Sequence, residues 1–227
     1  MKFVITGASK GIGSFLFNKF LNEGKEVYGT YNTSPPPSTE RNLSKVDITD
    51  NVEVKKWVDE IVKPGDQVVL INCAGINYNV FAHKADKIKW ERVIDVNLIG
   101  TFNVICAVLP FMRKSNYGRI INFSSFVAQK GIPGTSAYAA SKAGLWGLTR
   151  SIATENATKG ITINTLNLGY FDIGMISEVP GKILASIIKT IPVQKLGDSI
   201  NIYNAVKFLI NSDYINGTSI DINGGLF

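Results

Sequence analysis

A tyrosine and a lysine lie four residues apart in the segment Tyr138-Ala139-Ala140-Ser141-Lys142. In a helix, this spacing places both side chains on one face. A free tyrosine has a pKa of about 10, so it exchanges protons poorly at neutral pH, whereas a nearby ammonium favours the phenolate. The pair predicts a proton-transfer centre in which Lys142 lowers the pKa of Tyr138. Any helix can present such a pair, so the interpretation depends on its surroundings.

Two further polar residues accompany the pair. Ser125 ends an apolar strand-like run and precedes Tyr138 by 13 residues. Successive strand residues face opposite sides, so the adjacent Ser124 is expected to point away from Ser125. Asn97 lies inside a long apolar helical segment, where asparagine is unfavourable without a partner. Both a helix-packing hydrogen bond and a functional role remain open for Asn97.

A glycine-rich turn follows the first apolar run of the chain. It reads Thr6-Gly7-Ala8-Ser9-Lys10-Gly11-Ile12-Gly13 and opens a helical segment. Glycines in such a turn let the backbone approach a pyrophosphate, which then lies at the positive end of the helix. The turn predicts a dinucleotide site, with contacts from Gly7, Ser9, Lys10, Gly11, Ile12 and Gly13.

Strand-length apolar runs alternate with amphipathic segments along the chain, which indicates repeated βα units. The expected strands are Lys2–Ile5, Glu26–Thr30, Val68–Asn72, Arg119–Phe123, Thr162–Asn167 and Ser219–Ile222, with a weaker one at Leu43–Val46. Helical stripes include Ile12, Phe15, Leu16 and Phe20, and later Val54, Trp57, Val58, Ile61 and Val62, ended by Pro64-Gly65. The proline-rich stretch Thr33–Thr39 predicts an exposed loop. The pattern predicts one α/β domain over residues 1–227, a Rossmann-type doubly wound parallel sheet of about seven strands with helices on both faces.

These motifs together resemble the short-chain dehydrogenase/reductase superfamily along nearly the whole chain. The resemblance implies hydride transfer between a nicotinamide and a carbonyl or alcohol carbon. It assigns Ser125 to the substrate oxygen, Tyr138 to proton transfer, Lys142 to the tyrosine and the nicotinamide ribose, and Asn97 to a water and proton path. It also implies cofactor contacts from Asp47, Ile48, Asn72, Ala74 and Gly75, with Cys73 replacing the second asparagine usual in the family.

The end of the second expected strand bears on the choice of dinucleotide. NAD-binding proteins commonly place an acidic residue there to accept hydrogen bonds from the ribose. Here the stretch reads Gly29-Thr30-Tyr31-Asn32 and contains no acid. Lys10 occupies a position where family members that bind NADP often carry a cation. We therefore expect NADP(H), with Tyr31 and Asn32 beside the ribose, while NAD(H) stays the alternative.

The substrate end departs from the family pattern. Leu168-Gly169 replaces the usual Pro-Gly pair, so the following chain is expected either to be more flexible or to be held by Tyr170 and Phe171. Glu178–Ile191 resembles a substrate lid, although a packed surface helix is the other interpretation. The chain from Tyr214 to Gly225 resembles 3-oxoacyl-carrier-protein reductases, which use NADPH and usually form tetramers. Three functions stay open: a 3-oxoacyl thioester reductase, a reductase or dehydrogenase of another carbonyl or sugar derivative, and a silent NADP-binding protein.

The composition of the chain bears on nucleic-acid binding, membrane insertion, disulfides and metal sites. The net charge is +6, but the 24 lysines and arginines are scattered, which favours a solvated surface over nucleic-acid binding. No apolar run approaches the roughly 20 residues of a membrane span, so a cytoplasmic location is expected. Cys73 and Cys106 lie in apolar stretches and are expected to be buried, reduced thiols. The single histidine, His83, is expected at the surface, and no metal site is expected.

Overall fold

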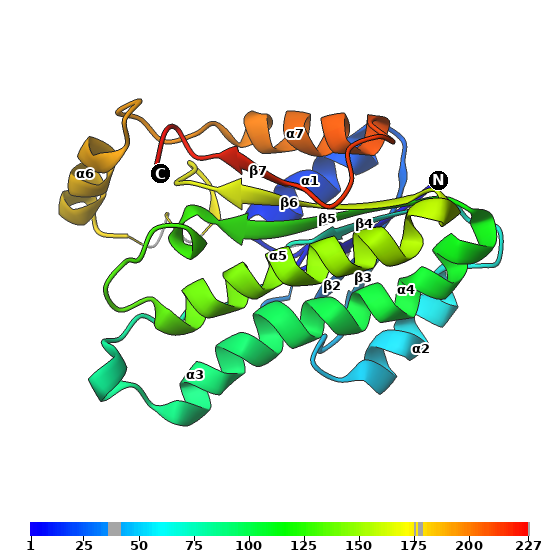
Figure 1. Ribbon diagram of the computed structural model, residues 1–227, viewed down its shortest axis with the longest axis horizontal. Coiled ribbons are helices and arrows are strands. Elements are labelled where there is room, and N and C mark those ends of the chain that lie inside the picture. Colours follow the sequence, from blue (N-terminus) through cyan, green and yellow to red (C-terminus); the bar gives the residue numbers. More distant parts are fainter. Residues whose placement is uncertain (36–41, 175, 177–178, 227) are drawn as a thin grey trace.

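A seven-stranded parallel sheet forms the centre of the protein (Figure 1). The computed structural model describes residues 1–35, 42–174, 176 and 179–226. The strand order is β3-β2-β1-β4-β5-β6-β7, and every neighbouring pair is parallel. The strands are β1 (Lys2–Thr6), β2 (Glu26–Tyr31), β3 (Leu43–Lys45), β4 (Val68–Asn72), β5 (Gly118–Ser125), β6 (Ile161–Leu168) and β7 (Ser219–Ile222).

All seven strands expected from the sequence are confirmed, including the weak β3. The largest difference is in β5 and β6, which are longer than their apolar runs. Both are central strands, buried along their whole length. Strand β5 extends through Ser124 and Ser125, and the Ser124 hydroxyl is satisfied by the Lys142 carbonyl, which a hydrophobicity pattern does not register. Strand β6 extends by Ile161 and Leu168, which pair with Gly118 and Ser125 of β5.

Helices cover both faces of the sheet, as Figure 1 shows. Residues of α1 and α7 pack on one face, and residues of α2, α4 and α5 pack on the other. The helices are α1 (Gly11–Asn22), α2 (Asn51–Ile61), α3 (Lys87–Ile94), α4 (Thr101–Ser115), α5 (Ser136–Asn156), α6 (Gly181–Thr190) and α7 (Ser199–Asn211). The predicted proline-rich loop lies partly outside the described residues, which resume at 42.

Helices α3 and α4 form one continuous rod. A π-helical turn, Asp95–Gly100, joins them. The combined segment Lys87–Ser115 is long and apolar enough to cross a membrane by length and composition, so the expectation of only short apolar runs was wrong. The sequence already placed Asn97 in a long apolar helical segment, but Asn97 and Thr101 divide that segment into shorter apolar runs. Both side chains are buried, and α4 packs on α2, β4 and β5 as a cover of the sheet.

The order of the strands fixes where a ligand can bind. Strand β1 has β2 on one side and β4 on the other, so the connections leave β1 and β4 in opposite directions. In such sheets, ligands bind in the crevice at the carboxyl ends of the strands, where the order reverses. The glycine turn follows β1, the Asn72–Gly75 segment follows β4, and Ser125 ends β5, so all three share that edge.

Candidate active site

The glycine turn is held against its neighbours by main-chain contacts. The Ala8 amide donates to the Thr30 carbonyl at 2.7 Å. Gly7 has a φ of +65°, and a β-carbon there would lie 2.8 Å from the α-carbon of Ala74. A β-carbon on Gly13 would lie 2.2 Å from the Gly7 carbonyl oxygen. Glycine is therefore required at both positions, and the turn presents bare backbone to the crevice.

The start of α1 is arranged to receive an anion. Lys10 is the N-cap residue, and its side chain makes no capping hydrogen bond. The first turn of the helix contains no acidic residue. The first amides of a helix lack intrahelical acceptors and carry partial positive charge, so they suit a pyrophosphate. The bare turn and the uncapped helix start fit the dinucleotide that the sequence predicted. Ser9 and Ile12, also predicted contacts, are half-buried in this turn.

The segment after β4 closes the other side of the crevice. The Ala74 amide donates to the Thr6 hydroxyl at 3.2 Å, which joins this segment to the glycine turn. Asn72 donates to Asn122 at 2.8 Å, while its own Oδ1 is buried with no hydrogen-bond partner in the described part of the chain. A β-carbon on Gly75 would lie 3.2 Å from Asn97 Oδ1 and 3.6 Å from Lys142 Nζ. The predicted cofactor and catalytic residues therefore converge at Gly75.

Asp47 is already engaged by protein groups. Its carboxylate accepts from the Thr49 amide and hydroxyl at 2.9 and 2.7 Å, and from Arg92 at 3.1 Å. Burial raises the pKa of Asp47, but the hydrogen bonds from Thr49 and Arg92 outweigh it and lower the pKa to about 2. Sequence reasoning missed Arg92, which is distant in the chain. The side chain of Ile48, another predicted contact, packs in the core against Gly100 instead of facing the crevice.

Ser125 and Tyr138 meet at the carboxyl edge of β5. The Ser125 hydroxyl lies near the Tyr138 phenol and accepts from the Val127 amide at 3.3 Å. Burial raises the pKa of Tyr138 to about 12, although the nearby Ser125 hydroxyl acts in the opposite direction. The expected net lowering of the Tyr138 pKa is wrong for the protein without ligand, because desolvation of the phenolate outweighs the groups that favour it. Tyr138 is therefore a neutral phenol at physiological pH.

Lys142 lies behind the tyrosine on α5. Its ammonium donates to the Phe123 carbonyl at 2.8 Å and lies 5.6 Å from the centre of the Tyr138 ring. The residue is only 6% exposed. Burial lowers the pKa of Lys142 to about 8, because the charged form loses its hydration. The site thus contains a phenol that holds its proton and an amine that releases one easily.

Asn97 lies in the π-helical turn with no exposed surface. Its Oδ1 accepts from the Ile76 amide at 2.8 Å, and its Nδ2 donates to the Ile76 carbonyl at 2.9 Å and to the Ser141 hydroxyl at 3.0 Å. The helix-packing interpretation is therefore present in the structure: Asn97 ties the segment after β4 to α5. Its main-chain carbonyl accepts from the Thr101 hydroxyl at 2.9 Å. Its role in a proton path stays a prediction.

A row of polar side chains anchors α5 to the sheet. Ser124 and Asn167 are paired in register on β5 and β6. As expected, Ser124 points away from Ser125: its hydroxyl donates to the Lys142 carbonyl at 2.9 Å. Asn167 accepts from the Trp146 indole at 2.9 Å. The two bonds are one helical turn apart on α5 and fix the position of Lys142. The Asn167–Trp146 pair was not predicted, because two polar residues near apolar runs do not reveal that they meet.

The chain after β6 is held by aromatic contacts. Leu168 is 7% exposed and packs in the core below the turn. Tyr170 packs edge-on against Phe126, with 5.1 Å between ring centres, and Phe171 is buried against Gly197. The chain after Leu168-Gly169 was expected either to be more flexible or to be held by Tyr170 and Phe171. The structure shows the second arrangement. Met175 and Glu178 lie outside the described residues.

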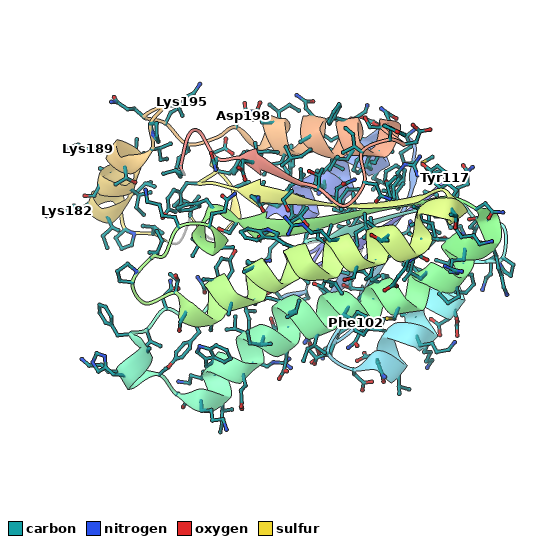
Figure 2. All side chains as sticks on the ribbon, viewed as in Figure 1. Phe102, Tyr117, Lys182, Lys189, Lys195 and Asp198 are labelled. Carbon is teal, nitrogen blue, oxygen red and sulfur yellow. The ribbon has the colours of Figure 1, made fainter. Side chains whose placement is uncertain are left out.

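The predicted lid corresponds to α6. No residue of this helix is fully buried. Leu184, Ile187 and Ile188 are half-buried, whereas Ile183 is 54% exposed. Figure 2 labels Lys182 and Lys189 on the outer side of this helix. Helix α6 therefore packs only partly against the rest of the described chain, which fits both a lid and a surface helix, and its role as a substrate lid stays a prediction.

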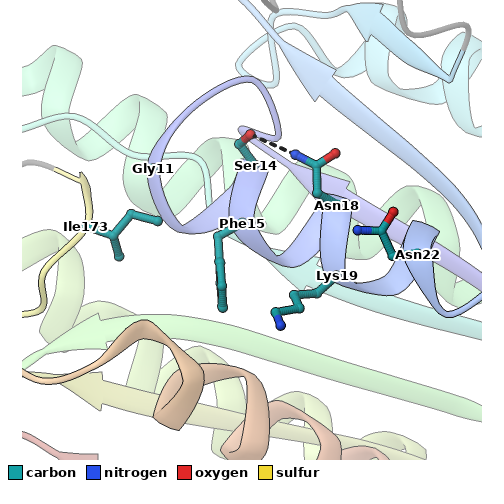
Figure 3. Close-up of a pocket in the computed structure, with 7 residues that line it drawn as sticks. All are labelled: Gly11, Ser14, Phe15, Asn18, Lys19, Asn22 and Ile173. Carbon is teal, nitrogen blue, oxygen red and sulfur yellow. Dashed lines mark hydrogen bonds between the residues drawn. The ribbon is translucent and has the colours of Figure 1, made fainter.

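A separate hollow of about 410 Å³ runs along the outer face of α1. Its lining residues are Gly11, Ser14, Phe15, Asn18, Lys19, Asn22 and Ile173 (Figure 3). It shares only Gly11 with the predicted cofactor residues and contains neither Ser125 nor Tyr138. Tight main-chain contacts shape the crevice described above, whereas this hollow is an open groove beside it.

Cys73, Cys106 and His83 lie in different parts of the fold. Cys73 is half-buried and Cys106 is exposed on α4, and both are free thiols. The expectation of burial was wrong for Cys106 because this residue lies on the outer side of the helix, beside Phe102. His83 is exposed, as expected.

Comparison with known proteins agrees with this arrangement. The pattern of the short chain dehydrogenase family matches residues 2–182. A 3-oxoacyl-[acyl-carrier-protein] reductase of Staphylococcus epidermidis is 33% identical, covering 99% of this chain and 98% of the relative. An acetoacetyl-CoA reductase of Shinella zoogloeoides is 36% identical, covering 99% and 97%. The ligand-free aldohexose dehydrogenase of Thermoplasma acidophilum superposes with a TM-score of 0.90 at 29% identity, covering 99% and 93%. The parallel sheet, the glycine turn and these matches along nearly the entire length establish that the chain belongs to the short-chain dehydrogenase family of oxidoreductases, which act on carbonyl and alcohol groups with nicotinamide cofactors.

Proposed function

We propose that this protein is an NADP(H)-dependent reductase of 3-oxoacyl thioesters, with Ser125, Tyr138 and Lys142 at its reaction centre. The observation that carries the proposal is the convergence of three side chains at the edge shared with the glycine turn: Ser125 at the end of β5, Tyr138 beside it, and the buried Lys142 ammonium 5.6 Å from the centre of the Tyr138 ring. A silent NADP-binding protein would have no need to keep the buried Ser125 and Lys142 beside the half-buried Tyr138, because burying polar side chains costs desolvation.

The protein groups divide the chemistry among them. A nicotinamide bound at this edge would supply the hydride for reduction, or accept it in the reverse direction. Ser125 holds the substrate carbonyl oxygen, and Tyr138 donates the proton to it. A pKa of about 12 keeps the Tyr138 proton in place until negative charge develops on that oxygen. The Lys142 ammonium, when protonated, stabilises the phenolate that remains and holds the nicotinamide ribose, and Asn97 keeps α5 and the segment after β4 in register.

The choice of NADP(H) rests on the end of β2. Tyr31 and Asn32 lie where an acidic residue commonly holds the ribose of NAD. Lys10 lies at the N-cap position of α1, and its side chain makes no hydrogen bond to the helix. A phosphate on that ribose therefore meets a cation and no carboxylate from these positions. The remaining contacts in this proposal are those of the glycine turn, Asp47, and the main chain of Ile48, Asn72, Ala74 and Gly75.

The substrate class rests on the surroundings of Ser125. Phe126, the next residue, is buried in a small apolar cluster. The other members of this cluster are Ile191 and Leu226, with Val127, Ile132, Tyr170 and Leu196 packed against them. The half-buried members of the cluster, Val127, Ile132, Tyr170 and Leu196, present apolar groups near Ser125, and these suit an acyl chain better than a polyol, whose hydroxyl groups need polar partners. The two reductases named above support the same class, whereas the aldohexose dehydrogenase supports a sugar substrate as the second candidate.

The proposed assembly is a cytoplasmic homo-oligomer, a dimer or tetramer. Ile99, Phe102 and Cys106 follow one another at helical spacing on the outer side of the α4 rod and are exposed. Figure 2 labels Phe102 on this helix. Apolar side chains gathered on one helix face favour contact with a second copy. Under this proposal, Phe102→Asp gives a smaller species than the unmodified protein in light scattering. An unmodified protein that is monomeric at all concentrations contradicts it.

The reaction itself is tested by a substrate panel. We expect NADPH oxidation with acetoacetyl thioesters and slower or no NADP reduction with aldohexoses. Rapid turnover of aldohexoses alone contradicts the thioester class but keeps the reaction centre. Tight NADPH binding with no turnover of any carbonyl in a broad panel favours the silent protein.

A further inference from the structure

The neighbour of Tyr31 across the sheet is a lysine on the edge strand. In the β2–β3 ladder, Tyr31 is paired with Lys45, Thr30 with Ser44 and Gly29 with Leu43. The Val46 amide donates to the Tyr31 carbonyl at 2.8 Å, which fixes this register up to the end of both strands. Lys45 lies 35 positions from Lys10 in the sequence, so no local motif connects the two lysines.

The side chains of Tyr31 and Lys45 leave the sheet on the side of α1. Gly29 and Leu43 face this helix, because a β-carbon on Gly29 would lie 2.5 Å from Leu43 Cδ2 and 3.1 Å from the Phe17 ring. Strand side chains alternate, so the residues two positions further along each strand share that face. Lys45 and Tyr31 therefore point to the same side as the N-terminal end of α1, which Lys10 caps.

The glycine turn is bonded to the residue that precedes Tyr31. The Thr30 carbonyl accepts from the Ala8 amide at 2.7 Å, and the Thr30 hydroxyl accepts from the Gly7 amide at 3.3 Å. In folds of this kind the residue near the end of the second strand contacts the ribose 2′ position, so a ribose bound here would meet the end of β2. Neighbouring strands are about 4.8 Å apart, so the long side chain of Lys45 on β3 reaches the same place from its outer side.

The local charge favours an anion there. Lys10 and Lys45 are both exposed, and within the described part of the chain neither ammonium has a carboxylate within 4 Å. The charge of Asp47, two residues beyond Lys45, is met by Arg92 at 3.1 Å. A dianionic phosphate between the two lysines would therefore meet little repulsion from that carboxylate.

We propose that Lys45 is a specificity-determining residue that, with Lys10, flanks the 2′-phosphate of the dinucleotide across Tyr31. This inference rests on the proposed preference for NADP(H). The competing explanation is that Lys45 only protects the edge of the sheet from pairing with another chain, as lysines on edge strands do.

Binding of two nucleotide fragments separates these explanations without any turnover. Calorimetry measures the dissociation constants of 2′,5′-ADP and 5′-AMP for the unmodified protein and for Lys45→Met. We expect the substitution to weaken 2′,5′-ADP about three- to tenfold at low salt, and less at high salt because the charges are screened, while 5′-AMP changes less than twofold. Lys45→Arg, which keeps the charge, should retain most of the 2′,5′-ADP affinity. Lys25→Met is the matched control, since it removes the same charge at the opposite end of β2 and should leave both constants unchanged.

The outcomes distinguish this inference from the proposed function. If the unmodified protein prefers 2′,5′-ADP and Lys45→Met keeps that preference, Lys45 is an edge-protecting residue and only this inference is overturned. If the unmodified protein binds both fragments equally, the NADP(H) preference and the role of Lys45 are both overturned. Circular dichroism of each variant verifies folding, and the Lys45→Arg protein supplies the charged comparison if the methionine variant is unstable.

Discussion

The hydroxyl of Ser124 donates a hydrogen bond of 2.9 Å to the main-chain carbonyl of Lys142. One strand residue thus fixes the helix position of the lysine, while its neighbour Ser125 faces Tyr138. The Asn167–Trp146 bond holds the next turn of the same helix. The geometry of the reaction centre therefore depends on how α5 packs on β5 and β6.

Loss of the Ser124 hydroxyl should weaken the packing of α5 on β5. We expect Ser124→Ala to lower the free energy of unfolding by about 1 kcal/mol, the usual contribution of one hydrogen bond. Turnover should fall several-fold because small misplacements of reacting groups are costly, while the affinity for cofactor is unchanged. The control is Ser212→Ala, which removes a similar hydroxyl-to-carbonyl bond to Phe208 at the exposed end of α7. Equal effects of both substitutions on turnover would contradict the anchoring role.

Burial of Lys142 should make stability depend on pH. The amine has a pKa of about 8 when folded and an ordinary value of 10.5. Between these values the unfolded chain binds more protons, so stability rises with pH, and below the folded value the cost of burying the charge is fully present. Lys142→Met lacks this cost, so its stability relative to the unmodified protein should decline by about 2–3 kcal/mol from pH 7 to pH 10. Urea unfolding at several pH values measures this difference, and a constant difference would contradict the assigned pKa.

Much of this architecture was predictable because the responsible signals are local. Apolar runs gave all seven strands, and the glycine turn gave the start of α1. The spacing of Tyr138 and Lys142 predicted their shared helix face. Two expectations failed for reasons that spacing does not contain: the pKa of Tyr138 follows from its burial, and the exposure of Cys106 follows from which side of α4 meets the sheet.

The glycine turn should not tolerate a side chain at Gly13. A β-carbon there would lie 2.2 Å from the Gly7 carbonyl oxygen, so the turn has to open. We expect Gly13→Ala to weaken dinucleotide binding at least about tenfold, measured by fluorescence titration. The control is Gly147→Ala on α5, where a β-carbon has no neighbour within 4 Å. That change should leave binding intact and raise stability by up to about 1 kcal/mol. Unchanged binding in Gly13→Ala would place the dinucleotide elsewhere.

An acidic residue at the end of β2 should alter the choice of dinucleotide. Tyr31→Asp places a carboxylate between Lys10 and Lys45, where it repels a 2′-phosphate and can accept hydrogen bonds from ribose hydroxyls. The ratio of NADPH to NADH affinity should fall at least about tenfold, as measured by competitive titration. A ratio that does not change means that Tyr31 lies away from the ribose.

The contacts that join distant segments were outside the reach of sequence reasoning. Arg92 reaches Asp47 because the α3–α4 rod passes beside the segment after β3, and Lys45 reaches Tyr31 because β3 adds to the edge of the sheet. Each contact depends on strand order and helix placement. Residue types and short spacings therefore predicted the reacting groups, while the residues that position and neutralise them required the fold.

The proton-transfer role of Tyr138 is tested most directly by Tyr138→Phe in a single-turnover measurement of NADPH oxidation. The carbonyl substrate should be acetoacetyl thioester or the best member of the panel. The substitution removes only the hydroxyl, so NADPH affinity should remain nearly unchanged. The rate of hydride transfer is expected to fall by about a hundred- to ten-thousandfold. Undiminished hydride transfer in this variant would contradict the assignment of Tyr138 as the proton donor.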